Sequence, residues 1–136
     1  YLGEKDFQQL QIVKKLVEIE NLPIKIIGCP IVRESSGLAM SSRNKRLNTD
    51  QLNEAILIYK TLLKVKENFK LLSISKLNQL VEKEFKNHPS LTLEYFEIAD
   101  TETLKTAIYK SKKKKYRAFI ACFIGGVRLI DNMALN

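Results

Sequence analysis

A helical pattern followed directly by a short β-branched run constrains the fold of this chain more than any other feature. Over residues 5–18, apolar side chains recur at three- and four-residue spacing, which is the pattern of an amphipathic helix. The next run, Ile24–Gly28, has the composition of a strand buried in a parallel sheet. A helix followed by such a strand is half of a βαβ unit, so we expect a first strand that ends near Gly3. Its end lies at the edge where open α/β sheets bind their ligands.

Two more helices are predicted after residue 46. Asn48 and Gln51 have the spacing of a capping box, and the helix that follows extends to about Phe69. Another helix begins at Ser73 or Ser75. We expect the apolar stripe of the longer helix to include Leu52, Ile56, Tyr59 and Leu63, with Ala55, Leu62 and Phe69 beside them.

The C-terminal segments predict a small antiparallel sheet. The alternation of Leu91–Tyr95 continues with shifted faces through Ile98, which indicates a β-bulge. The pair Gly125 and Gly126 separates two apolar runs and has the composition of a tight hairpin turn. Between these strands, Asp100 is expected to open a short connecting helix.

These elements predict an α/β fold class with two parts. Residues 1–46 have the pattern of a parallel-sheet α/β domain, and we expect the amino-terminal part of that domain to precede them. Residues 47–136 have the pattern of a small α+β domain, with helices first and a small antiparallel sheet after them.

Composition narrows the class of protein. With 45% hydrophobic residues the chain can bury a core of its own, and no apolar run approaches the roughly 20 residues that a bilayer crossing needs. Cys29 and Cys122 lie in apolar runs without metal-ligand spacing, so we expect buried thiols in a reducing, cytoplasmic compartment. The net charge of +8 raises the question of nucleic acid. Much of it comes from Lys110 and Lys112–Lys115 without interleaved aromatic residues, which favours a solvated segment.

Two glycine-led stretches have the composition of a phosphate site. Gly3–Asp6 lies at the predicted strand end, and Gly37–Asn44 combines a turn glycine with two serines and an arginine. Backbone N–H groups freed by a turn or a helix start can point at an anion, and Lys5 and Arg43 add positive charge. A Ser-Ser-Arg-Asn run alone is most often a loop that caps the next helix, and this alternative stays open.

The runs GEKDFQQL (residues 3–10) and VRESSGLAMSSRN (residues 32–44), at this separation, resemble the pantothenate synthetase (pantoate–β-alanine ligase) family. The run RLIDN (residues 128–132) resembles the closing strand of that family. The family's earlier half contains a His-x-Gly-His type motif, whereas the only histidine here is His88. We therefore expect this chain to be a C-terminal portion of such an enzyme and to be inactive alone.

The resemblance implies a fold, a reaction and a setting. Residues 1–46 are expected to be the C-terminal part of a Rossmann-like domain that binds ATP and pantoate, and residues 47–136 a lid. The implied reaction condenses pantoate with β-alanine to give pantothenate, AMP and pyrophosphate through a pantoyl adenylate. Mg²⁺ is implied by the triphosphate, without a metal site in the protein. The complete enzyme is expected to be a cytoplasmic homodimer with no membrane or nucleic-acid partner.

The resemblance also implies roles for single residues. Gly3 and Asp6 match ribose-binding positions, Gln9 matches a glutamine that holds pantoate, and Val32 matches a strand position whose backbone reads adenine. Five residues match phosphate-binding positions: Lys5, Met40, Ser41, Ser42 and Arg43. Met40 is expected to bind through its backbone, and the side chains of the other four are the expected catalytic groups.

Two alternatives remain at this stage. One is another adenylyl or nucleotidyl transferase on the same scaffold, because a fold and a phosphate loop do not name a substrate. The other is a basic RNA-binding module, for which affinity would fall steeply with added salt.

Overall fold

The computed structural model describes residues 1–136, which divide into two compact units, Tyr1–Val32 and Arg33–Asn136. The second unit therefore begins before residue 47, and the segment 33–46 belongs with the α+β part of the chain. The assignment of residues 1–46 to an ATP- and pantoate-binding domain and of 47–136 to a lid stays a prediction about the complete protein.

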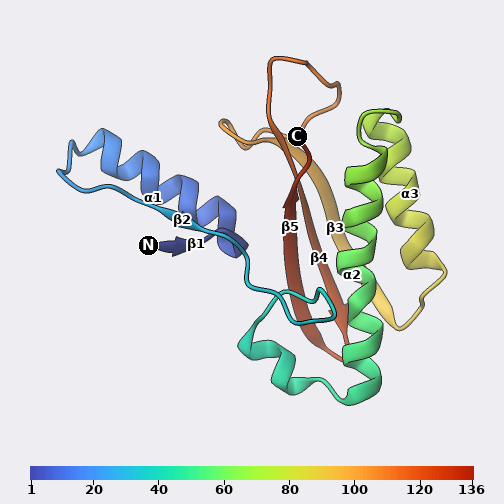
Figure 1. Ribbon diagram of the computed structural model, residues 1–136. Helices are drawn as coiled ribbons and strands as arrows, with labels where there is room; N and C mark the ends of the chain where they lie inside the picture. Colours follow the sequence, from blue (N-terminus) through green and yellow to red (C-terminus); the bar gives the residue numbers. More distant parts are fainter. The chain divides into compact units, whose positions relative to one another are not determined.

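The first unit contains a short parallel strand pair and one helix (Figure 1). Strand β1 (Leu2–Gly3) leads through the 3₁₀ turn η1 (Glu4–Asp6) into helix α1 (Phe7–Ile19), and β2 (Gly28–Cys29) follows. β1 and β2 are parallel, with Leu2 opposite Gly28 and Gly3 opposite Cys29, as the predicted βαβ half-unit requires. The predicted strand over residues 24–28 was too long, because β1 offers only two residues as hydrogen-bonding partners.

Helix α1 buries only its first turns. Phe7 and Leu10 are buried, and Leu10 packs so closely on Gly28 that a Cβ there would lie 2.9 Å from the Leu10 Cδ2 atom. Further along the helix, Ile12, Leu16 and Ile19 are 65%, 51% and 63% exposed. The helical pattern over residues 5–18 predicts Leu16 on the buried face, and this prediction is wrong for this chain. Beyond its first turns α1 presents an apolar outer surface.

The second unit is an α+β structure in which two helices cover one face of a three-stranded sheet (Figure 1). The sheet order is β3-β4-β5, and both pairings are antiparallel. Together with the parallel pair of the first unit, this arrangement confirms the predicted α/β class with a small α+β part. The elements of this unit are η2 (Ser42–Arg46), α2 (Thr49–Asn68), α3 (Ile74–Lys86), β3 (Leu91–Asp100), β4 (Tyr116–Ile124) and β5 (Val127–Ala134).

The helix starts agree with the capping signals in the sequence. At α2, the Asn48 side chain accepts from the Gln51 N–H at 2.8 Å while the Asn48 N–H donates to Gln51 Oε1 at 3.0 Å. At α3, the Ser73 Oγ atom accepts from the Lys76 N–H at 3.2 Å. Side-chain caps satisfy N–H groups that have no partner within the helix, which explains why both starts were readable.

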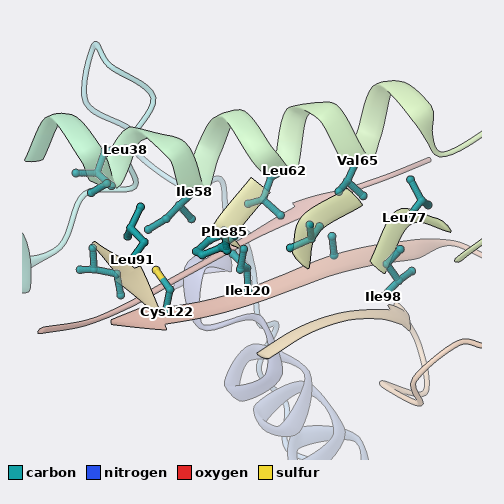
Figure 2. Packing of buried hydrophobic residues seen from close by; sticks show 14 of the residues in the cluster. Leu38, Ile58, Leu62, Val65, Leu77, Phe85, Leu91, Ile98, Ile120 and Cys122 are labelled. Atoms are coloured by element: carbon teal, nitrogen blue, oxygen red, sulfur yellow. The ribbon is translucent and has the colours of Figure 1, made fainter. Parts of the chain in front are cut away.

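The apolar core lies between the two helices and the sheet, as Figure 2 shows. The fully buried apolar side chains from α2 are Ala55, Ile58, Leu62 and Val65, so Ala55 and Leu62, which were expected beside the stripe, do lie in the core. The predicted Leu52, Ile56, Tyr59 and Leu63 are only half-buried. Both stripes fit a 3.6-residue period, and packing against the sheet selects between them.

The two cysteines differ in their surroundings. Cys122 lies on β4 inside the core and is fully buried, as expected (Figure 2). This burial raises the pKa of its thiol to about 12, with the nearby carboxylates of Asp131 and Glu94 acting in the same direction. Cys29 is also a free thiol but only half-buried, so the expectation of two buried thiols holds for Cys122 alone.

The sheet and its connections confirm a predicted β-bulge and a predicted hairpin turn, and they correct a predicted helix. The register between β3 and β4 shifts between Leu93 and Tyr95, and Gly125 and Gly126 form the hairpin turn with positive φ angles of 54° and 76°. The predicted short helix after Asp100 is absent. A turn stands there instead, and its backbone hydrogen bonds from Thr103 and Glu102 hold the pKa of the Asp100 carboxyl below its ordinary value.

Candidate functional site

The first group of predicted site residues lies where β1 leads into α1. Gly3 ends the strand, and Lys5 and Asp6 form the 3₁₀ turn with Glu4. Neither the turn nor α1 begins with a side-chain capping hydrogen bond. Helix α1 begins one 3₁₀ turn after the end of a parallel strand, and helix starts in this position bind phosphate oxygens in many proteins.

Gly3 leaves open space beside the strand end. Its φ of −71° and ψ of 136° are ordinary extended values, so the backbone does not require glycine. A Cβ placed here would meet no protein atom within 4 Å. The fold itself thus gives no reason for a glycine, which supports a role in leaving room for a ligand.

Gln9 and Val32 are the other predicted ligand contacts in this unit. Gln9 is exposed on α1, about one turn beyond Lys5. Val32 is the last residue of the unit, and its side chain is exposed. Both positions are open to solvent, as contact with a small molecule requires.

The second group lies on the loop Arg33–Asn44, which begins with a tight turn. An isolated antiparallel bridge joins Arg33 to Ala39, and the Glu34 N–H donates to the Leu38 carbonyl at 2.8 Å. Gly37 has a φ of +93°, and a Cβ on it would lie 2.0 Å from the Tyr59 ring. This position therefore requires glycine both for its backbone conformation and for the close approach of the ring.

Met40, Ser41, Ser42 and Arg43 follow this turn, and the last two are exposed. The Ser41 Oγ atom accepts from the Arg43 N–H at 3.2 Å and so caps η2. The capping alternative from the sequence is therefore correct for Ser41. It does not exclude anion binding, because a hydroxyl that accepts one hydrogen bond still donates its own hydrogen.

A pocket of about 480 Å³ lies behind this loop. Serine and asparagine side chains line it together with leucines and Ile56, and its charged residues are one cation, Lys45, and one anion, Glu34. The two charges balance, so the pocket has no net positive charge with which to hold a polyphosphate. The exposed side of the loop, which carries Ser42 and Arg43, suits phosphate better.

The predicted site residues are divided between the two units of the chain. Gly3, Lys5, Asp6, Gln9 and Val32 belong to the first unit. Met40, Ser41, Ser42 and Arg43 belong to the second unit. A single ATP site formed by both groups stays a prediction.

Sequence reasoning assigned no role to Arg33 or Asp131, although both lie in the quoted runs. The guanidinium of Arg33 donates to both carboxylate oxygens of Asp131, at 2.7 and 2.9 Å, and to the Gly37 carbonyl at 3.0 Å. The two partners are 98 positions apart in the chain, so no local pattern indicates their pairing. The only available signal was that both runs resemble the same family.

The lysine-rich segment lies on the connection between β3 and β4. Lys112–Lys115 are exposed, and Lys114 pairs with Asp100 at 3.2 Å. Lys110 donates to the carbonyls of Phe69 and Leu72 at the end of α2, where a cation is favourable. These contacts give Lys110 and Lys114 structural roles.

Two further features bear on ligands and membranes. No group of three or more His, Cys, Asp or Glu side chains is arranged to hold a metal ion. None of the helices combines the length and the apolar composition that a membrane crossing requires.

Comparison with known families agrees with the resemblance found in the runs at residues 3–10 and 32–44. The family described as Pantoate-beta-alanine ligase matches residues 1–134 of the 136. The chain belongs to this family. Pantothenate synthetase from Christiangramia forsetii is 55% identical over the whole chain, and that from Flavobacterium psychrophilum is 51% identical. The chain spans only 48% of the length of each of these relatives.

Solved structures of family members share the fold. A pantothenate synthetase from Thermus thermophilus aligns with a TM-score of 0.88 and 32% identity, over 98% of this chain and 48% of that one. A pantoate-β-alanine ligase from Francisella tularensis aligns with a TM-score of 0.66 and 36% identity, over 99% and 42%. The crystal structure of the Francisella tularensis protein is a complex with β-γ ATP and β-alanine.

Proposed function

We propose that this chain is part of an enzyme that condenses pantoate with β-alanine at the expense of ATP. The products are pantothenate, AMP and pyrophosphate, and the intermediate is a pantoyl adenylate. The family match over residues 1–134 carries this proposal. Because the chain spans about half of its relatives, the other half of the catalytic site is expected outside these 136 residues.

The proposed chemistry demands positioning and charge neutralisation more than covalent work by the protein. A pantoate carboxylate attacks the α-phosphorus atom of ATP, and pyrophosphate leaves. Negative charge then has to be stabilised on the transferred and departing oxygen atoms. We assign this role to the side chains of Lys5, Ser41, Ser42 and Arg43 and to the backbone N–H of Met40.

The other site residues are assigned to orientation of the substrates. The position of Gly3 at the strand end and the open space beside it support contacts of Gly3 and Asp6 with the ribose. Gln9 is assigned to pantoate, since its amide both donates and accepts hydrogen bonds. The backbone of Val32 is assigned to adenine.

ATP is expected to enter as its Mg²⁺ complex. Mg²⁺ prefers phosphate oxygens and several water molecules, and this chain offers no cluster of three ligating side chains. The cation is therefore treated as part of the substrate. We further propose that the complete enzyme is a homodimer in the cytoplasm.

A chimera tests this proposal most directly. The 136 residues replace the matching segment of the Christiangramia forsetii relative, and pyrophosphate release is measured with ATP and pantoate. Lys5→Ala is expected to lower kcat for adenylate formation by on the order of 10²- to 10³-fold, the scale of one lost preorganised donor. Gln9→Ala should instead raise the apparent KM for pantoate and leave that for ATP unchanged.

Lys113→Ala is the matched control, because Lys113 is an exposed lysine of the β3–β4 connection. This variant should change neither kcat for adenylate formation nor the apparent KM for pantoate. Salt-sensitive RNA binding that depends on Lys113, combined with normal kinetics for Lys5→Ala, would contradict the assignment of the phosphate site.

A further inference from the structure

An arginine–aspartate pair holds the start of the Met40–Arg43 loop against the sheet. The side chain of Asp131 on β5 is 2% exposed and that of Arg33 is 19% exposed, and their two hydrogen bonds are 2.7 and 2.9 Å long. The Arg33 guanidinium also lies 4.5 Å from the centre of the Tyr59 ring on α2. Arg33 is thus held by a strand and a helix of the same unit.

The same guanidinium reaches the loop that it opens. It donates to the Gly37 carbonyl at 3.0 Å, and the Tyr59 ring packs so closely on Gly37 that a Cβ there would lie 2.0 Å from a ring atom. The bridge between Arg33 and Ala39 then places Met40 directly after this fixed turn. The Arg33 guanidinium therefore connects the turn to both β5 and α2.

The far end of the loop is attached to the sheet and to the turn as well. Arg43 Nη1 donates to the Arg128 carbonyl on β5 at 3.3 Å, and Asn44 Nδ2 donates to the Ala39 carbonyl at 3.1 Å. The four residues Met40–Arg43 are therefore fixed on both sides. We therefore expect changes at Arg33 to displace the N–H and hydroxyl groups of this loop.

Stability alone does not account for the pair. Removing two charges from water costs about as much free energy as their attraction returns, and apolar replacements of buried pairs are often as stable. A bidentate arginine contact, in contrast, fixes direction as well as distance. We propose that Arg33, oriented by Asp131 and Tyr59, is a positioning residue that sets the Met40–Arg43 loop for the triphosphate. This inference rests on the function proposed above.

The test separates positioning from stability in the chimeric enzyme. Asp131→Asn leaves the largely covered Arg33 guanidinium without its anion and should lower the melting temperature by roughly 10 °C. The double variant Arg33→Met with Asp131→Leu removes both charges and should melt within about 3 °C of the parent chimera. The double variant nevertheless lacks the guanidinium that donates to the Gly37 carbonyl. Its kcat/KM for ATP should therefore fall about 10²-fold, which is the effect of displacing binding groups by about 1 Å.

The apparent KM for pantoate should change less than about twofold, because Gln9, which is assigned to pantoate, belongs to the other unit of the chain. Arg33→Lys keeps the charge but loses the bidentate geometry, and it should show the same loss in kcat/KM for ATP in a folded protein. The matched control is Lys64→Met with Glu84→Leu, which removes a 2.6 Å ion pair between α2 and α3 that does not touch the loop. This control should keep the parent kinetics.

Three results would overturn the inference. If the double variant has both the melting temperature and the kcat/KM for ATP of the parent chimera, the pair only stabilises the fold. Parent ATP kinetics in Arg33→Lys would show that the bidentate geometry is dispensable, and this variant decides the question where the double variant fails to fold. A parent chimera without ATP-dependent turnover would overturn the proposed function and the inference with it.

Discussion

At the scale of single residues, Cys122 offers a test of burial. Its thiol has a pKa of about 12 in the folded chain, against roughly 8.5 for a free cysteine. Thiolate, not thiol, attacks disulfide reagents, so Cys122 should react with Ellman's reagent far more slowly than an exposed cysteine at pH 8. A Cys29→Ser variant isolates this signal, and unfolding in guanidinium provides the control. Rapid labelling of the folded variant would contradict the burial of Cys122.

The same raised pKa has a consequence for stability. Below about pH 8.5 the thiol is neutral in both the folded and the unfolded chain. As the pH rises from there through the folded pKa of about 12, only the unfolded chain gains the charge, so the folded state loses stability. The Cys122 contribution is therefore present at neutral pH and lost in alkali.

Residues with local signals were predictable, and those with distant partners were not. Gly37 was identified as a turn residue from its neighbours, and its φ of +93° confirms it. The pairing of Arg33 with Asp131 depends on a contact across 98 positions. The residues next to Arg33 and Asp131 in the sequence do not distinguish these two from charged residues that lie on the surface.

At the scale of elements, the capping box of α2 carries a measurable share of the stability. Asn48→Ala removes the acceptor for the Gln51 N–H and should lower the free energy of unfolding by about 1 kcal/mol. Asn48→Asp retains an acceptor and adds a charge that favours a helix start, so it is the matched control. Urea denaturation followed by circular dichroism measures both. Equal midpoints for all three proteins would show that the cap contributes nothing.

Element types were more predictable than element faces and bounds. The caps at Asn48 and Ser73 are local hydrogen bonds, and sequence spacing reveals them. The buried face of α2 depends on the sheet that it contacts, and two adjacent stripes fit its periodicity equally well. Asp100 shows the same limit, because an aspartate that caps a helix and one that opens a turn give the same signal.

At the scale of the whole molecule, the two units differ in how much apolar surface they bury. The second unit contains a core of side chains from α2, α3 and all three strands of its sheet. The first unit has a two-residue strand pair and a helix with Ile12, Leu16 and Ile19 exposed. Apolar surface of this kind marks an interface. We expect the part of the relatives that this chain does not match to cover it.

Hydrogen exchange of the isolated 136-residue chain tests this difference. Amides open locally at a free energy that depends on nearby buried contacts, so residues 1–32 should exchange faster than residues 33–136. The change in rate should fall between Val32 and Arg33, because the Arg33–Asp131 pair ties the loop to β5. Mass spectrometry of peptic peptides resolves this boundary.

In the chimera, exchange over residues 1–32 should slow as the relative's segment covers α1. Uniform protection in the isolated chain would contradict the exposed interface, and fast exchange through residue 46 would favour the boundary predicted from sequence.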